Sequence, residues 1–343
     1  MKIAGVHHRS IGRTADGKGA RILDQRDLPW RVTWVDLRSV GEAATAIRDM
    51  WTRGAPLIGA TAAYGMAMAI ATDPSDAAMA RDYAMLLETR PTAVNLRWAL
   101  DEIVAAVRAL PCEERGAAAF ARADQITDED AAMSAAIGQH GLPLIRALHD
   151  ENPDRPVNIL THCNAGWLAT VDYGTATAPI YAAHDAGIPV HVWVDETRPR
   201  NQGAYLTAFE LAEHGVLHTV IVDNAGGLLM MQGRVDMVIV GTDRVAANGD
   251  VCNKIGTYLK ALAAHDNGVP FYVALPSTTF DASTPTGADV PIEERSAGEV
   301  VLVAGQEGTV RITASPAANP AFDVTPARLV TAYVTERGVS PII

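Results

Sequence analysis

The spacing of hydrophobic and polar positions changes along the chain, and each change predicts a different kind of element. Short alternating runs predict strands at 20–23 and 32–35, and residues 16–19 just before them have the composition of a turn. From residue 41 the apolar positions recur every three or four residues, which predicts amphipathic helices at 41–51 and 57–70. Two more helices are expected at 96–110 and 113–140. Residues 1–130 are therefore predicted to form a smaller, mostly helical domain that carries short strands.

The second part of the chain, residues 131–343, alternates between strand and helix patterns. Strands are predicted at 157–161, 189–194, 218–222, 236–241 and 270–275, with helix-sized segments between them at 174–187, 203–214, 224–232 and 253–266. This order predicts an α/β fold, in which helices cover both faces of a parallel sheet. After Ser277 the pattern breaks down into polar loops, and helix is expected again only at 325–329.

Composition narrows the class of protein. The chain has 343 residues, of which 48% are hydrophobic and 20% charged, as in a soluble globular protein with a large core. A net charge of −12 argues against nucleic acid and anionic membranes as partners. Three scattered cysteines predict no disulfide framework and no zinc site, and favour a cytoplasmic location. Residues 54–72 lack charge, but Pro56 and three glycines favour a buried helix over a membrane span.

The most reactive side chains follow two of the predicted strands. Cys163 comes just after the strand at 157–161, and Asp243 comes just after the strand at 236–241, in each case with a helix expected to follow. Open α/β sheets place their ligands at the carboxyl ends of their strands, so we take Cys163 and Asp243 as a candidate chemical pair. A thiol at the amino end of a helix ionises more easily. A desolvated carboxyl group can stay protonated and act as a general acid.

Both residues have less specific interpretations. Most free cysteines are small buried hydrophobes, and Asp243 fits a helix cap or an ion pair with Arg244 equally well. His162 lies beside Cys163, but adjacent residues on a strand point to opposite faces, so a structural role is expected for it. Cys112 and Cys252 have no comparable setting and are expected to be structural.

Three segments have the composition of an anion site. Arg53 precedes Gly54, Ala55 and a predicted helix, so a guanidinium group would lie beside free backbone amides. Asn253-Lys254 is expected at the start of another helix, and Arg90 stands just before Pro91. A solvated surface cation is the common alternative for each of them. The chain has no G-x-G-x-x-G fingerprint after a strand, which disfavours a dinucleotide-binding dehydrogenase.

Six segments in order resemble the signatures of the S-methyl-5-thioribose-1-phosphate isomerase family. They are residues 53–59, 90–96, 161–166, 195–203, 241–258 and 319–326. The resemblance implies an aldose–ketose isomerase of methionine salvage, with a small N-terminal domain on a Rossmann-like C-terminal domain. It also implies a homodimer, a small phosphorylated sugar as substrate, and neither cofactor nor metal.

By the matching motifs, the resemblance implies that Cys163 and Asp243 are the catalytic pair. It implies that the substrate is bound by Arg53, Gly54, Ala55, Arg90, Gln202, Asn253 and Lys254. Trp167 stands where a small residue is common in the family, so we expect it to reshape the pocket near the thiomethyl end.

The sequence leaves three questions open. The substrate could be a related sugar phosphate, such as 5-deoxyribose 1-phosphate or ribose 1,5-bisphosphate. A non-catalytic protein is the alternative of a different class, because the fold resembles regulatory subunits of the eukaryotic exchange factor for translation initiation. Within the isomerase interpretation, hydrogen could move as a proton through a phosphoenolate or as a hydride between the two carbons.

Overall fold

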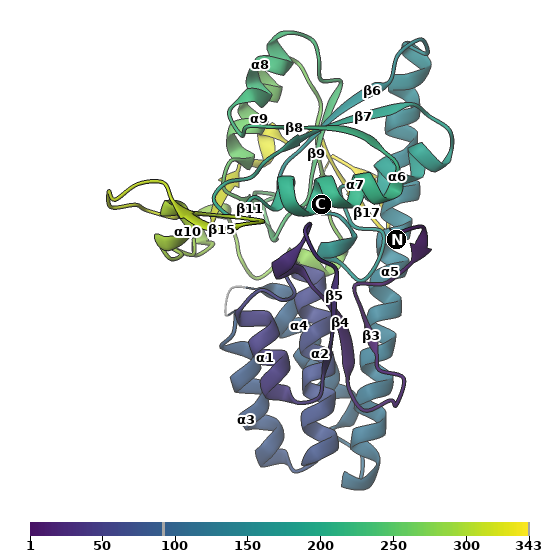
Figure 1. Cartoon of the computed structure of the whole chain (residues 1–343). Coiled ribbons are helices and arrows are strands. Elements are labelled where there is room, and N and C mark those ends of the chain that lie inside the picture. Colours follow the sequence, from purple (N-terminus) through teal and green to yellow (C-terminus); the bar gives the residue numbers. More distant parts are fainter. Residues whose placement is uncertain (91–92, 342–343) are drawn as a thin grey trace.

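The computed structural model describes residues 1–90 and 93–341, and one long helix runs through both halves of the molecule (Figure 1). This helix is α5 (Cys112–Glu151). The lower half in Figure 1 is mostly helical, and the upper half is built on a parallel sheet. Both parts of the expected α/β architecture are therefore confirmed.

The N-terminal half packs its helices around α2. They are α1 (Val40–Arg48), α2 (Ala55–Thr72), α3 (Asp76–Leu87) and α4 (Val94–Val107), together with the first part of α5. A hairpin, β1 (Lys2–Ile3) and β2 (Val6–His7), precedes an antiparallel sheet of β3 (Ile11–Arg13), β4 (Ala20–Asp24) and β5 (Thr33–Leu37). Among the described residues, α2 is long and apolar enough for a membrane span, but 83% of it is buried inside the protein. It is therefore the buried core helix that the sequence predicts.

The C-terminal half is built on a seven-stranded sheet with the order β18-β17-β12-β9-β6-β7-β8. Its strands are β6 (Val157–Thr161), β7 (Val190–Asp195), β8 (Leu217–Ile221), β9 (Met237–Val240), β12 (Phe271–Ala274), β17 (Ala332–Thr335) and β18 (Gly338–Ser340). All neighbours pair in parallel except β17 and β18, which are antiparallel. The five predicted strands are confirmed, whereas β17 and β18 were not expected.

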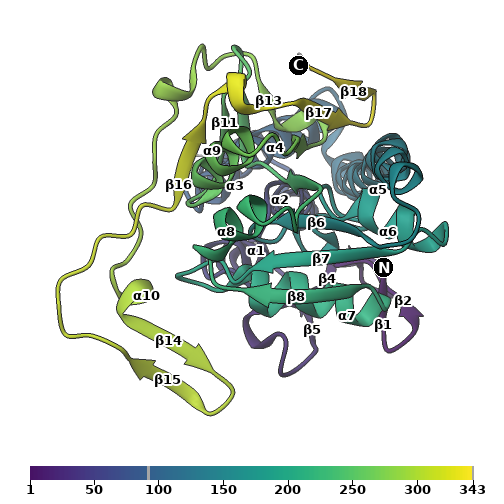
Figure 2. The same ribbon diagram turned by 90° about the horizontal axis from the view of Figure 1, so that it is seen from above.

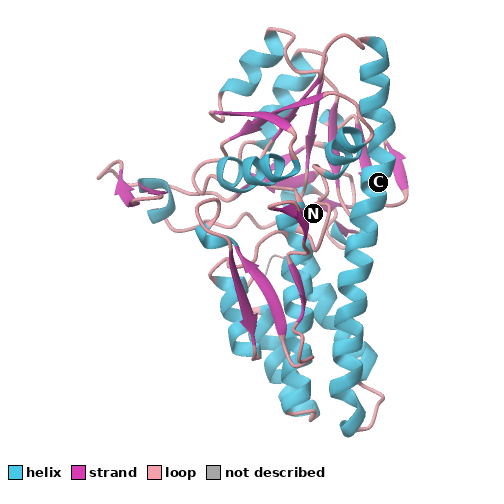
Figure 3. Ribbon diagram, turned by 45° about the vertical axis from the view of Figure 1, so that its right-hand side comes forward, coloured by secondary structure: helices cyan, strands magenta, loops and turns pink. Residues whose placement is uncertain are grey.

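Side chains that alternate along each strand supply two separate cores. On one face, Ile159 and Val192 pack with α5, α6 (Ala178–Asp185) and α7 (Ala208–His214). On the other face, Leu160 and Val238 pack with α8 (Ala225–Met231) and α9 (Thr257–Asp266). Figures 2 and 3 show the sheet enclosed between these helices. Burial of both faces explains why the strands are apolar runs rather than alternating ones.

The helix predicted at 253–266 is α9, but it begins only at Thr257 and does not follow β9 directly. Between β9 and α9, β10 (Arg244–Ala246) and β11 (Val251–Lys254) form an antiparallel hairpin. The turn between them contains Asn248-Gly249, and Gly249 has a φ of 86°. Asn-Gly is a strong hairpin signal, and here it overrides the apparent helical pattern. The hairpin belongs to a four-stranded sheet with β13 (Phe280–Asp281) and β16 (Phe322–Thr325).

The region after residue 277 is more ordered than the sequence suggests. The helix expected at 325–329 is a single 3-10 turn, Ala327–Leu329. A projecting arm is formed by α10 (Gly298–Val301) and the hairpin of β14 (Leu302–Gly305) and β15 (Gly308–Arg311), seen at the left of Figure 1. We refer to residues 298–311 as the arm.

The predicted domain boundary at residues 130 and 131 falls inside α5. Ala119 to Ala131 of this helix belong to the N-terminal core, whereas Ile137 and Ile145 belong to the core of the sheet. No break in the helix marks the boundary, which therefore stays a prediction.

Asp130 makes the stability of this helix dependent on pH. Its side chain is buried and accepts a hydrogen bond from the backbone N–H of Val171 at 2.7 Å. Burial raises the pKa of its carboxyl group to about 7, and the neighbouring charge of Asp172 adds to the shift. The stability that the protonated form contributes is fully present below the unfolded pKa of about 4 and is lost as pH rises through about 7.

We therefore expect Asp130→Asn to be more stable than wild type at pH 8.5, by roughly 2–4 kcal/mol, because the amide keeps the acceptor and never ionises. The difference should shrink towards pH 4.5. Urea unfolding at both pH values measures it, with Asp128→Asn as the control because Asp128 is exposed on the same helix. A difference that does not change with pH would contradict this account.

Candidate active site

A cavity of about 70 Å³ lies between the two halves, at the carboxyl ends of β6 and β9. It is lined by all nine residues that the sequence places in a site: Arg53, Gly54, Ala55, Arg90, Cys163, Gln202, Asp243, Asn253 and Lys254. The structure thus brings segments almost 200 residues apart into one cavity. The individual roles of these residues stay predictions.

Cys163 sits on a strained turn after β6. Its φ is 65°, in the left-handed region that non-glycine residues seldom adopt. Its backbone N–H donates to Thr197 Oγ1 at 2.8 Å, and its carbonyl accepts from Thr207 Oγ1 at 2.7 Å. These two hydroxyl groups hold the turn from both sides. Such strain at a cavity is typical of a functional position.

Cys163 does not lie at the amino end of a helix, because the next helical turn of the described chain begins at Trp167, and the helix predicted at 174–187 is α6, which begins at Ala178. The thiol therefore receives its positive surroundings from side chains. Burial raises the pKa of the Cys163 thiol, while Arg53 and Lys254 partly offset the shift. The resting group is accordingly a thiol that can hold a proton.

Asp243 follows β9 and leads into the β10–β11 hairpin. Its backbone N–H donates to the carbonyl of Cys252 at 3.1 Å. Burial raises the pKa of its carboxyl group, and the charges of Lys254, Arg90 and Arg53 oppose the rise. A carboxyl group with a raised pKa is suited to act as a general acid.

The segment before α2 provides donors for an anion. Gly54 has a φ of 96°, and a Cβ atom there would lie 2.5 Å from Ala169, so only glycine fits. The first amides of the 18-residue helix α2 follow directly. Arg53 Nε and Arg90 Nε are buried without a hydrogen-bond partner among the described residues. Unpaired buried donors around a cavity favour an anionic ligand.

Asn253 and Lys254 do not begin a helix as expected, because both lie on strand β11. The strand carries them to the same cavity, where Lys254 Nζ donates to the carbonyl of Ala321 at 2.9 Å and lies 4.8 Å from the centre of the Phe322 ring. Burial lowers the pKa of the Lys254 amine. Asn253 Nδ2 donates to Thr257 Oγ1 at 3.0 Å.

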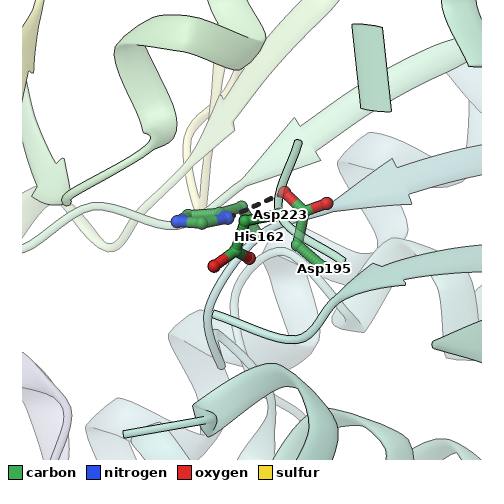
Figure 4. A group of neighbouring side chains, drawn as sticks. All are labelled: His162, Asp195 and Asp223. Carbon is green, nitrogen blue, oxygen red and sulfur yellow. Dashed lines mark hydrogen bonds and ion pairs between the residues drawn. The ribbon is translucent and has the colours of Figure 1, made fainter. Parts of the chain in front are cut away.

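His162 is tied into the protein behind Cys163. Its Nδ1 lies 2.8 Å from an oxygen of Asp195, and its Nε2 lies 2.8 Å from the carbonyl of Ile255 (Figure 4). Both partners accept, so both bonds form together only when the ring carries two N–H groups. The structural role expected for His162 agrees with this placement.

Figure 4 also shows Asp223 beside this pair, and one ligand atom from each of the three side chains lies within 4.8 Å of the others. This spacing is compatible with a metal ion. However, Lys260 Nζ lies 2.9 Å from the same oxygen of Asp195 and also donates to the carbonyl of Asp223. A protein ammonium group thus supplies positive charge where a cation would bind.

Trp167 does not shape the cavity as expected. Its side chain is 1% exposed and packs in the core formed with α5, α6 and α7. The tryptophan therefore fills the space beneath the Cys163 turn instead of contacting a ligand.

Comparisons with known proteins identify the family. Residues 51–342 match the model of the initiation factor 2 subunit family. The methylthioribose-1-phosphate isomerase of Brucella anthropi is 61% identical, with 99% of this chain and 96% of that protein covered. The protein of the same name from Sinorhizobium medicae is 60% identical, with the same coverage. The chain belongs to the initiation factor 2 subunit family and, within it, to the methylthioribose-1-phosphate isomerases.

Solved structures agree on the fold. The crystal structure of 5-methylthioribose 1-phosphate isomerase from Pyrococcus horikoshii has a TM-score of 0.84 at 39% identity, covering 98% of this chain and 94% of that one. A structure from A. fulgidus, named as the translation initiation factor eIF-2B subunit delta, has a TM-score of 0.82 at 38% identity. It covers 97% of this chain and 96% of that chain. The predicted Rossmann-like architecture is confirmed.

Glu210, which sequence reasoning missed, holds the Cys163 turn from below. It lies on α7, and its buried carboxylate accepts four hydrogen bonds. The donors are Asn164 Nδ2 at 2.9 Å, the backbone N–H groups of Leu168 at 2.8 Å and Trp167 at 3.1 Å, and the hydroxyl of Tyr181 at 3.0 Å. Burial raises the pKa of the Glu210 carboxyl, and the donors from Asn164 and Leu168 act against the rise.

Asn164 carries this contact across to the N-terminal half. Its carbonyl accepts from the guanidinium of Arg53 at 3.3 and 3.4 Å, and its side-chain oxygen accepts from the same group. The approach of Glu210 to this turn requires Gly166, because a Cβ atom there would overlap the Glu210 carboxylate at 1.6 Å. Glu210 therefore positions Arg53 through one intermediate amide.

We expect Glu210→Gln to unfold more easily than wild type, by roughly 1–3 kcal/mol, because an amide of the same shape leaves a buried N–H donor facing another donor. The value of kcat/KM should also fall, since Arg53 and the Cys163 turn lose their common support. Urea unfolding and steady-state kinetics measure the two effects.

Glu213→Gln is the matched control on the same helix, because its partly exposed carboxylate accepts only from the backbone N–H of Ala4 among the contacts described. Its stability should stay within about 0.5 kcal/mol of wild type. Equal effects of the two substitutions would contradict a positioning role for Glu210.

Proposed function

We propose that the protein is an aldose–ketose isomerase that converts S-methyl-5-thio-D-ribose 1-phosphate to S-methyl-5-thio-D-ribulose 1-phosphate in methionine salvage. The observation that carries this proposal is the convergence of nine predicted residues, from both halves, on one cavity. Identity of about 60% to proteins named for this reaction supports it.

The substrate poses a specific chemical problem. Its anomeric oxygen carries phosphate, so the sugar ring cannot open as a free hemiacetal does. A group that protonates the ring oxygen overcomes this block. Asp243 is suited to that step because burial raises the pKa of its carboxyl group, which keeps a proton available.

The phosphate is expected at the end of the cavity where the cations meet. Arg90 and Lys254 line this end, and the first amides of α2 follow Gly54 and Ala55. Arg90 lies 3.8 Å from Glu293, which leaves its Nε unpaired. A bound phosphate would satisfy these donors and offset the buried positive charge.

Cys163 is assigned the movement of hydrogen between carbon 2 and carbon 1. In the proton route, the Cys163 thiol first loses its proton to solvent. The thiolate then removes the proton from carbon 2, and the thiol formed in this way returns it to carbon 1. In the hydride route, the hydrogen passes directly between the carbons while Cys163 polarises the substrate.

Purified protein should convert methylthioribose 1-phosphate, and Cys163→Ser and Asp243→Asn should each lower kcat by about 10²- to 10⁴-fold. Cys112→Ser is the control, because Cys112 is exposed and lies outside the cavity. Activity is measured beside 5-deoxyribose 1-phosphate and ribose 1,5-bisphosphate. A preference for either of these two compounds would change the assigned substrate. If none of the three compounds is turned over, the proposal that the protein is an enzyme fails.

Deuterium at carbon 2 of the substrate distinguishes the two routes. We expect the proton route, because the charges of Arg53 and Lys254 favour the Cys163 thiolate that accepts the proton, and burial favours the thiol that returns it. Product formed in ordinary water should therefore have lost part of its deuterium to solvent. Mass spectrometry measures this loss, and complete retention at carbon 1 would favour hydride transfer.

A non-catalytic regulatory subunit is the second candidate function. The similarity to the A. fulgidus structure named as a translation initiation factor subunit favours it. The presence of Cys163 and Asp243 in one cavity with several cations favours the enzyme.

We also propose a homodimer in the cytoplasm. Support for self-association comes from exposed large apolar side chains on β8, α8 and α9, among them Leu217, Met231 and Leu259. The three free cysteines are compatible with a reducing compartment.

A further inference from the structure

A second cavity, of about 420 Å³, adjoins the catalytic one, which measures about 70 Å³. Met50, Arg53 and Gln202 line both cavities and form the junction between them. The remaining walls come from residues 25–30, the loop and π-helix at 199–206, and the arm. Cavities of this size hold ligands much larger than a methylthio group.

The walls of the second cavity combine apolar side chains with amides and charged groups. Six of the residues that line it are Leu28, Trp30, Met50, Tyr205, Leu206 and Leu302. The rings of Trp30 and Tyr205 pack with their centres 4.9 Å apart. The two arginines that line this cavity alone are both paired with carboxylates, Arg26 with Asp24 at 2.6 Å and Arg200 with Glu299 at 3.0 Å. Such walls suit an uncharged, apolar group better than a phosphate.

Three buried side-chain amide groups favour a ligand that carries a hydrogen-bond donor. Gln25, Asn201 and Gln202 line the cavity with exposed fractions of 5%, 8% and 7%, and the side-chain oxygen of each lacks a hydrogen-bond partner among the described residues. In Gln25 the NH₂ group donates to the carbonyl of Leu168 at 2.6 Å, so its oxygen is the free atom. A ligand hydroxyl or amine that reaches these oxygens after a small side-chain movement would supply the missing hydrogen bonds.

We propose that the second cavity receives the 5-substituent of the sugar phosphate and accepts thioethers much longer than methyl, preferring those that carry a hydroxyl or amine. This inference rests on the proposed function. Arg90, Lys254 and Asp243 line the catalytic cavity but not the second one, so the phosphate and the reacting carbons lie away from the junction. The other end of the sugar then faces Met50 and Gln202, beyond which the second cavity opens.

The arm offers a way to alter this cavity selectively. Leu302 and Ala304 alternate along β14 with Val303, and Ala304 pairs with Thr309 of β15. Leu302, Ala304 and Thr309 therefore share one face of the hairpin, and all three line the cavity. Val303 and its partner Val310 occupy the opposite face, where Val310 is 65% exposed.

The first test compares four ribose 1-phosphates with methylthio, propylthio, 2-hydroxyethylthio or benzylthio groups at carbon 5. Wild type should turn over the propylthio and benzylthio compounds within about tenfold of the methylthio value of kcat/KM. The hydroxyethylthio compound should exceed its isostere, the propylthio compound, by about two- to tenfold, the worth of one hydrogen bond. Turnover of the methylthio compound with rejection of the longer ones would overturn the inference.

The second test uses Ala304→Phe, which fills the cavity, and Val303→Phe, which adds the same ring to the opposite face. The ratio of kcat/KM for the benzylthio compound to that for the methylthio compound should fall at least about tenfold in Ala304→Phe. It should stay at the wild-type value in Val303→Phe. An unchanged ratio in Ala304→Phe would overturn the inference.

Binding separates this inference from the proposed function. If wild type does not isomerise methylthioribose 1-phosphate, the proposed function fails. Calorimetric affinities for the same four compounds still test the cavity. Ala304→Phe should weaken binding of the benzylthio compound and leave binding of the methylthio compound unchanged. If Ala304→Phe weakens binding of both compounds equally, or changes binding of neither, the second cavity is not part of the binding site.

Discussion

The buried carboxylate of Glu210 holds together the parts of the site that come from different halves of the molecule. Its four donors include two consecutive backbone N–H groups, those of Trp167 and Leu168, which fix the turn after β6. A carboxylate without access to water needs a compensating charge, and Arg53 supplies it through Asn164. The turn that carries Cys163 and the guanidinium that lines the cavity are thus parts of one buried network.

The electrostatic character of the cavity follows from burial opposed by cations. Desolvation alone would hold the protons on Cys163 and Asp243 very tightly, whereas Arg53 and Lys254 act in the opposite direction on both groups. Burial also lowers the pKa values of Arg53 and Lys254, so burial disfavours the charged form of all four groups. A phosphate dianion would restore balance, which links substrate binding to the proton affinities of the reacting groups.

Apolar runs and their polar ends were sufficient to predict the sheet, five of its seven strands and the positions of Cys163 and Asp243. They failed where local turn chemistry decided the structure, as at Asn248-Gly249, where a hairpin replaced a helix and moved Lys254 onto a strand. Glu210 could not be predicted, because nothing near it in the sequence indicates that an α7 side chain reaches a turn more than 40 residues away. Contacts between residues so far apart in the sequence depend on how the helices pack, and a local sequence pattern does not predict that packing.

A continuous α5 has a mechanical consequence for access to the cavity. Its 40 residues extend for about 60 Å at the usual rise of 1.5 Å per residue, and they anchor both cores without an intervening linker. A hinge motion between the halves would have to break this helix, so the distance between the two walls of the cavity is nearly constant. The parts of the site that are free to adjust are then the smaller segments, such as the arm, which lines the adjoining second cavity.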